Sequence, residues 1–268
     1  MELKKTTRIE SDLIGEREIP GHILYGVQTL RGIENFPISN FHLNDYPLFI
    51  NGLAMTKWAA AVANHRLGLL TDAQKDGIVK ACKEILEGKH HEHFPVDMIQ
   101  GGAGTTTNMN ANEVICNRAL QIMGHEAGEF AHLSPNDHVN CSQSTNDAYP
   151  TAIHLGLYAT YLKFRPHLLD LIESLRAKSR EFAHVLKMGR TQLEDAVPMS
   201  LGQTFGGFAS ILQDEIKNLD FAAEEFLTVN MGATAIGTGI CAQPNYAEYC
   251  IEALREVTGW DIRLSADL

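Results

Sequence analysis

The chain has 268 residues, of which 44% are hydrophobic and 21% charged, a composition typical of globular proteins with one or two domains. Its 33 acidic and 22 basic residues give a net charge of −11, which disfavours nucleic acids and anionic membranes as partners. The odd number of cysteines, without a C-x-x-C pair, indicates reduced thiols and a cytoplasmic protein. The N-terminus lacks the apolar core of a signal peptide, and no stretch of ~20 apolar residues predicts a membrane span.

Short apolar groups between glycines and prolines occupy the first 45 residues and predict turns or a hairpin, with little helix. Three helical segments with an apolar face follow: 47–69, 71–88 and 109–123. The second begins with Thr71 and Gln74 in capping-box spacing and ends at Gly88. Strand patterns are scarce throughout, so helices are expected to dominate the fold.

Two longer helical segments, 150–186 and 200–230, dominate the second half, and the second repeats apolar residues every three or four positions. A helix of some thirty residues is ~45 Å long, more than a small domain needs, so we expect it to pack against other subunits. Pro166 is expected to kink or divide the first of these helices. Asn245 with Glu248 predicts a final helix that ends near Gly259.

Three polar clusters precede predicted helices and are expected to be loops: GGAGTTTNMNANE (101–113), PNDHVNCSQSTND (135–147) and KMGRTQLEDAVPMSLGQ (187–203). Because Pro150 is tolerated only near the first turn of a helix, residues 144–147 should lie at a helix N-terminus. Free amide donors and the helix dipole make such an end suitable for binding an anion. Helix capping also explains polar residues there, so a solvated cap and a ligand site both remain open.

The same patterns disfavour several ligand classes. GGAGTTTN lacks the G-K-[ST] ending of a P-loop, and GATAIGTG (232–239) is not G-x-G-x-x-G, which argues against nucleotides. The segment KHHEHF (89–94) lacks the spacing of a helical metal pair, so we expect a solvated loop there and no metal site. Cys141 has no assignable base and is expected to be a buried thiol rather than a nucleophile. A small carboxylate, bound by hydroxyls, amides and a helix end, fits best.

The three clusters, in this order, are similar to the conserved regions of the aspartase/fumarase superfamily. Two further stretches, YGVQTLRGIENF near the start and VNMGATAIGTG near residue 235, also resemble these enzymes. Within the superfamily, the sequence most resembles the aspartate ammonia-lyases, which eliminate ammonia from L-aspartate to give fumarate. This resemblance covers essentially the whole chain and implies no cofactor.

The resemblance also implies a mainly α fold whose long central helices assemble into a homotetramer with active sites shared between subunits. We expect an N-terminal, mostly helical domain over residues 1–142. An incomplete long-helix bundle domain is expected over residues 143–268.

Ser144, Thr145 and Asn146 match the family positions that bind a substrate carboxylate. Four further residues match other substrate-contacting positions of the family: Thr105, Thr191, Gln192 and Arg31. Of these, Arg31 would face the second carboxylate. In the family reaction, removal of a proton from C3 gives an aci-carboxylate, and each hydrogen-bond donor aimed at it would lower the barrier by ~3 kcal/mol.

Two departures from the family patterns qualify this assignment. Gln192 and Ala103 stand where fumarases of this kind carry His and Ser, which favours ammonia elimination over hydration because an amide cannot accept the proton. The family loop G-S-S-x-M-P-x-K-x-N-P, with the serine that takes the C3 proton, is not among the motifs, so no catalytic residue is assigned and this chain alone is expected to be inactive. Fumarate hydratase and a non-catalytic helical scaffold remain the alternatives.

Overall fold

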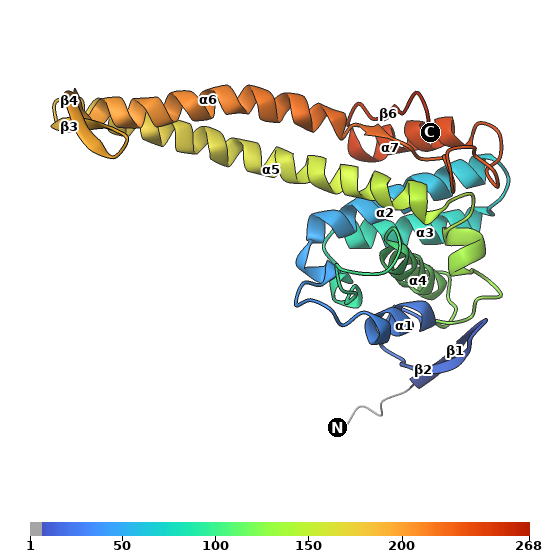
Figure 1. Ribbon diagram of the computed structural model, residues 1–268. Coiled ribbons are helices and arrows are strands. Elements are labelled where there is room, and N and C mark those ends of the chain that lie inside the picture. The colour runs from blue at the N-terminus through green and yellow to red at the C-terminus, as the bar shows by residue number, and fades with distance from the viewer. Residues whose placement is uncertain (1–6) are drawn as a thin grey trace. The chain divides into compact units, whose positions relative to one another are not determined.

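The computed structural model describes residues 7–268 and shows a mainly helical chain (Figure 1). Its longer helices are α1 (Val27–Asn35), α2 (Pro47–Arg66), α3 (Asp72–Leu86), α4 (Thr105–Ile122), α5 (Thr145–Glu181), α6 (Leu201–Glu225) and α7 (Tyr246–Thr258). Three short helical turns lie between them: η1 (Leu43–Asp45), η2 (His91–His93) and η3 (Pro135–Val139). Within the described range, no helix is both long and apolar enough to span a bilayer.

Between residues 7 and 268, the strands form three two-stranded sheets. Strands β1 (Thr7–Asp12) and β2 (Gly15–Pro20) pair antiparallel, as do β3 (Leu186–Thr191) and β4 (Glu194–Ser200). The remaining pair, β5 (Thr228–Val229) and β6 (Arg263–Leu264), is parallel. The first sheet confirms the hairpin that the first 45 residues predict.

The described residues divide into two compact units, one formed by 7–157 together with 227–268, and the other by 158–226. The apolar core of the first unit lies mainly between α2, α3 and α4, whose fully buried side chains include Ile50, Ile78 and Leu120. Helix α2 also approaches the first turns of α5 closely, because a Cβ on Gly52 would lie 2.2 Å from the carbonyl oxygen of Ala152. The domain boundary expected after residue 142 stays a prediction.

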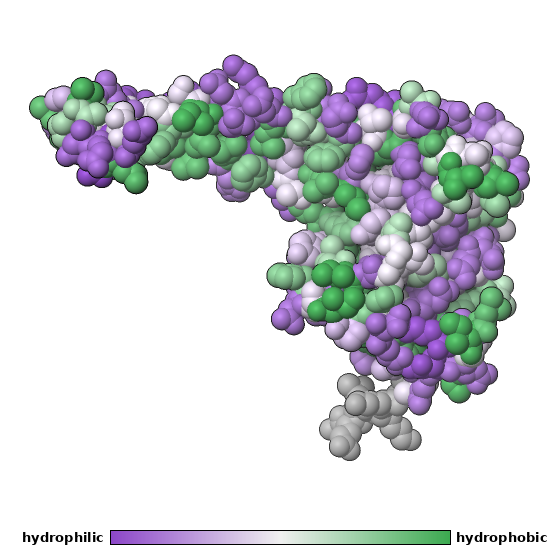
Figure 2. All heavy atoms as spheres, in the orientation of Figure 1, coloured by the Kyte–Doolittle hydropathy of each residue, from purple (hydrophilic) through white to green (hydrophobic). Residues whose placement is uncertain are grey.

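The second unit is a helical hairpin in which the later part of α5 runs antiparallel to α6, with the β3–β4 sheet at the connection (Figure 1). A small core of Ile172, Ala209 and Ile216 joins the two helices, and Arg165 pairs with Asp220. Many apolar side chains of the hairpin are exposed: Leu162, Phe164, Leu169, Leu171, Phe208, Ile211 and Phe221. Figure 2 shows hydrophobic side chains along this hairpin, which fits the expectation that the long helices need further packing partners.

Most predicted helices are confirmed, but α1 forms where little helix was expected, and three further expectations are corrected. Helix α5 continues through Pro166, so this proline does not divide it. Most of the cluster 187–203, expected to be a loop, forms the β3–β4 hairpin, whose turn is built from Gln192 and Leu193 at positive φ of 51° and 68°. That backbone is typical of a tight hairpin turn, but it usually carries Asn-Gly, so the sequence signal was missing. Asn245 adopts a left-handed backbone and makes no capping bond, so α7 begins without the expected contribution of its side chain.

Candidate functional site

The polar row 142–147 lies at the N-terminus of α5, as the sequence predicts. The Ser144 carbonyl accepts the first helical bond from Ala148, at 3.1 Å. The Ser144 hydroxyl accepts a bond from the Asn146 amide at 3.2 Å, so its own O–H remains available to donate. Ser144 and Thr145 are half-buried and Asn146 is exposed, so a small molecule can reach all three.

The fully buried Asp147 ties this helix end to the segment 230–235. Its carboxylate accepts bonds from the backbone amides of Gly232 (3.1 Å) and Thr234 (3.0 Å), and one from the Ser144 amide (2.9 Å). Burial raises the pKa of Asp147, while these donors act in the opposite direction. Asp147 therefore acts as a structural anchor that holds the row in place.

A second set of contacts with the same segment fixes Asn146. Its side-chain amide donates to the Ala235 carbonyl at 2.8 Å. Its own carbonyl, which Pro150 leaves without the usual helical donor, accepts a bond from the Asn230 side chain at 3.3 Å. This replacement explains how α5 begins at Thr145 although Pro150 follows so closely.

Beneath the row lies Lys57 of α2, which is completely buried. Its ammonium donates to the side-chain oxygens of Asn108 (2.7 Å), Asn140 (3.0 Å) and Gln143 (2.8 Å). Desolvation lowers the pKa of Lys57 to about 7, and the charge of Asp147 opposes this shift. Lys57 was not predicted to be a site residue, although one lysine within the apolar run AMTKWAAAVA is a recognisable signal.

Lys57 reaches Thr145 through Asn108 of α4. The Asn108 amide nitrogen donates to Thr145 Oγ1 at 3.2 Å, while its oxygen is bound by Lys57. Because Thr145 Oγ1 accepts this bond, its hydroxyl hydrogen is free to point towards a ligand. The buried network thus orients the donor that the sequence assigns to substrate binding.

Thr105 is the first residue of α4, and it is exposed. The preceding Gly104 has a φ of +89°, and a Cβ there would lie 2.5 Å from the Tyr149 ring of α5. This close approach brings the first turns of α4 and α5 together, so the positive ends of two helices converge beside Thr105 and Thr145. Such an arrangement is suited to a carboxylate.

Arg31 of α1 and Thr105 line one cavity of about 1120 Å³ in the first unit. Arg31 makes two bonds to the Asp12 carboxylate, at 2.9 and 3.0 Å, and one to the Gly15 carbonyl. The Arg31 bond also lowers the pKa of Asp12, so the pair is ionised and neutralises its own charge. A role for Arg31 opposite a substrate carboxylate would require it to leave this pair, and that role stays a prediction.

Thr191 and Gln192 lie in the second unit, at the turn of the β3–β4 hairpin, and both are exposed. The sites described above are formed by residues of the first unit. The assignment of Thr191 and Gln192 to substrate binding therefore stays a prediction. Cys141 is only partly buried rather than fully buried as expected, but burial still raises the pKa of its thiol, as for an unreactive cysteine.

Several known proteins resemble this chain over most of its length. A family model described as Lyase matches residues 15–266. The aspartate ammonia-lyase of Pseudomonas aeruginosa is 52% identical over 264 residues, which are 98% of this chain and 56% of that protein. The aspartate ammonia-lyase of Escherichia coli (strain K12) is 49% identical over 267 residues, 99% of this chain and 56% of that protein. The chain thus spans about half the length of these curated relatives.

Solved structures agree in fold. The fumarate lyase:delta crystallin from Brucella melitensis bound to cobalt superposes with a TM-score of 0.94 at 48% identity, covering 98% of this chain and 57% of that chain. A class II fumarase from Schistosoma mansoni superposes with a TM-score of 0.85 at 38% identity, covering 95% of this chain and 53% of that chain. Both comparisons extend over nearly all of the residues present here.

Proposed function

The chain belongs to the lyase family that includes aspartases and fumarases, and we propose that it is the part of an aspartate ammonia-lyase that binds a substrate carboxylate. The observation that carries this proposal is the N-terminal turn of α5. There Ser144 and Thr145 present hydroxyl donors beside the first turn of α4. The reaction is the elimination of ammonia from L-aspartate to give fumarate.

The geometry suits the charge that develops in this reaction. Removing a proton from C3 of aspartate places a second negative charge on the adjacent carboxylate, so donors fixed before the reaction stabilise the transition state more than the substrate. The Thr145 hydroxyl is fixed by Asn108, and Asn108 is fixed in turn by Lys57. Two converging helix dipoles add to the same effect.

A binding experiment tests this assignment without depending on turnover. Fumarate and L-aspartate are titrated into the protein by calorimetry, first with the natural sequence and then with Thr145→Val, which keeps the shape but removes the hydroxyl. Because a hydrogen bond to a charged group contributes ~1.5–3 kcal/mol, we expect affinity to fall by roughly 10- to 150-fold. Ser174→Ala, at an exposed position of the same helix, serves as the control and should bind normally. Unchanged affinity in Thr145→Val would sink the assignment.

Turnover of the same preparation is measured to test the alternatives in substrate and activity. Fumarate formation is followed from L-aspartate and from L-malate; formation from malate alone would favour a hydratase. We further propose that this chain by itself binds without turning substrate over, since the serine loop of the family is not among its motifs. Measurable fumarate production from aspartate would overturn that proposal and leave the binding proposal intact.

We also propose a cytoplasmic homotetramer with shared sites. The exposed apolar side chains of the α5–α6 hairpin and the five free cysteines support this proposal. Sedimentation analysis tests it, because a monomer at micromolar concentration would contradict it.

A further inference from the structure

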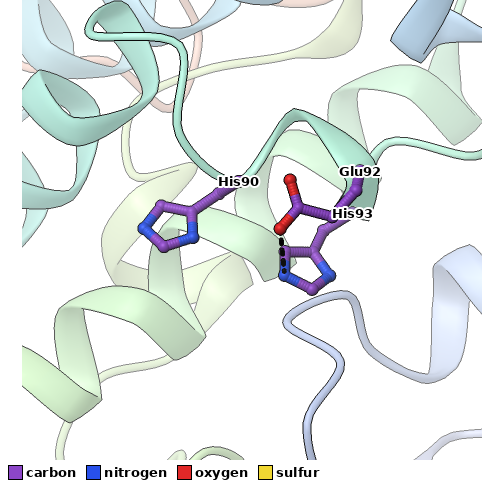
Figure 3. Close-up of side chains that lie close together, drawn as sticks. All are labelled: His90, Glu92 and His93. Atoms are coloured by element: carbon purple, nitrogen blue, oxygen red, sulfur yellow. Dashed lines mark ion pairs between the residues drawn. The ribbon is translucent and has the colours of Figure 1, made fainter.

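A cluster of possible metal ligands lies at turn η2, outside the residues assigned to substrate binding. One ligand atom from each of His90, Glu92 and His93 lies within 4.8 Å of the other two. Figure 3 shows the Glu92 carboxylate between the two imidazole rings, and one oxygen lies 3.5 Å from His93 Nε2. The solvated loop expected for residues 89–94 is therefore wrong in part, because Phe94 is fully buried and the His93 side chain is only 9% exposed.

We propose that His90, Glu92 and His93 bind one divalent transition-metal ion, of the class of zinc, cobalt or nickel. Two imidazoles and a carboxylate are ligands that these ions prefer, with bonds of ~2.0–2.2 Å. Ligand atoms around such an ion lie at most ~4.4 Å apart, slightly closer than the present arrangement. The Glu92 side chain is 71% exposed and can make this small movement, and water would complete the coordination.

The surroundings of His90 already match those of a metal ligand. Its Nε2 lies 2.8 Å from a Glu84 carboxylate oxygen, and Glu84 is held in turn by Arg118. Histidines that bind metals typically donate their second ring N–H to such a carboxylate, which fixes the tautomer. The Glu84 carboxylate favours the tautomer with the proton on Nε2, which leaves Nδ1 of His90 as the ligand atom.

The turn itself is fixed before any ion binds. His90 adopts a left-handed backbone with φ of 68°, which is uncommon for a residue other than glycine. The His91 ring bonds the Ile85 carbonyl at 2.8 Å, and the Lys89 amide donates to the Glu84 carbonyl at 3.0 Å. These contacts hold the turn against the end of α3, so ion binding requires little ordering of the chain.

His93 is buried and connects the turn to α4. Its carbonyl accepts a bond from the Asn110 side chain at 3.0 Å. Its Nδ1 accepts from the Leu24 amide at 3.5 Å, a contact at the limit of hydrogen bonding. Metal binding at Nε2 would place the proton on Nδ1. The weak contact with the Leu24 amide would then be lost, whereas the bond from Asn110 would remain.

A second cluster, His125, Glu129 and His132, has similar spacing but poorer geometry. The two rings stack with centroids 3.8 Å apart and planes at 13° to each other. Because the lone pairs of imidazole lie in the ring plane, nearly parallel stacked rings cannot both point at one ion. This cluster therefore supplies a control rather than a second proposal.

The test uses the protein without a histidine tag, stripped of metal by a chelator and titrated with Co²⁺ while visible absorbance is recorded. We expect one Co²⁺ per chain, displaced by Zn²⁺ but not by Mg²⁺, which prefers oxygen ligands. Glu92→Gln and His90→Gln should each weaken Co²⁺ binding by at least ~10-fold. His91→Gln, a non-ligand change in the same turn that keeps an N–H donor for Ile85, should bind normally.

Circular dichroism confirms that each variant is folded, and Zn²⁺ should raise the melting temperature of the natural sequence but not of Glu92→Gln. The proposal is overturned if saturable Co²⁺ binding is absent. It is equally overturned if Glu92→Gln binds as tightly as the natural sequence, or if His132→Gln abolishes binding, which would place the ion at the other cluster.

Discussion

Replacing Lys57 by methionine tests the idea that this buried side chain organises the carboxylate site. Among residues 7–268, Asn108 Oδ1 and Gln143 Oε1 accept a hydrogen bond only from the Lys57 ammonium. The Asn140 oxygen, in contrast, keeps donors from Asn108 and Asn112. Two orphaned acceptors at ~1–3 kcal/mol each give an expected loss of about 2–6 kcal/mol in the free energy of unfolding, partly offset because no ammonium is buried.

The pH dependence of this loss has a defined sign. Burial lowers the pKa of Lys57 from 10.5 to about 7, so between these values the unfolded chain holds a proton that the folded protein has released. The unfolding free energy of the natural sequence therefore rises with pH in this window, by at most ~1.4 kcal/mol per pH unit from this group. Lys57→Met lacks the titrating group, so its deficit should be smallest below pH 7 and grow towards pH 10.

Urea unfolding of both proteins between about pH 6 and about pH 9.5 measures this difference. Lys163→Met, at an exposed position of α5, is the matched control and should show a constant offset. Carbon-13 labelling of the lysines adds a direct reading, in which one resonance titrates near neutral pH and is missing from Lys57→Met. Parallel stability curves for Lys57→Met and the natural sequence would refute the reasoning.

Two further changes test the packing and the charges of the first unit. Gly52→Ala should destabilise the protein by ~1–3 kcal/mol, because its methyl group would lie 2.2 Å from a backbone oxygen of α5. Gly207→Ala is the control: its Cβ would lie in open space, so the same thermal melts should show no loss of stability or a gain. Arg31 lowers the pKa of Asp12, so their ion pair stabilises the folded protein above the unfolded pKa of 3.8, and this stabilisation is lost as the pH falls through the folded pKa. Asp12→Asn should therefore make the free energy of unfolding less dependent on pH at acid pH. An acid profile identical to that of the natural sequence would contradict this effect.

Local chemistry made the helices predictable. The reciprocal bonds of Thr71 and Gln74 form as the capping box predicts, and α3 ends two residues before Gly88, which has a φ of 85°. Where a turn uses residues outside the usual set, as at Gln192 and Leu193, the sequence carries no local signal and the β3–β4 hairpin was missed. The start of α4 was placed four residues late because its first turn is all polar.

The candidate site was predictable only where it is local in sequence. The row from Ser144 to Asn146 could be assigned to a helix end from Pro150 alone. The partners of Lys57 lie 51 to 86 residues away, and no spacing rule reaches over such distances. The pairing of Arg31 with Asp12, 19 residues apart, was likewise invisible before the β1–β2 hairpin was described.

The hydrogen bonds that Asp147 accepts from the Gly232 and Thr234 amides have a consequence for how the protein folds. They join residues 85 and 87 positions apart, so the start of α5 is completed only by a segment made much later on the ribosome. Closing a flexible loop of this length would cost roughly 4 kcal/mol in chain entropy. The α5–α6 hairpin, held by Arg165 with Asp220 and by its own small core, shortens this loop because it folds the intervening chain back on itself. We therefore expect the hairpin to form first, and mutations that weaken it to slow the assembly of a carboxylate site that they never touch.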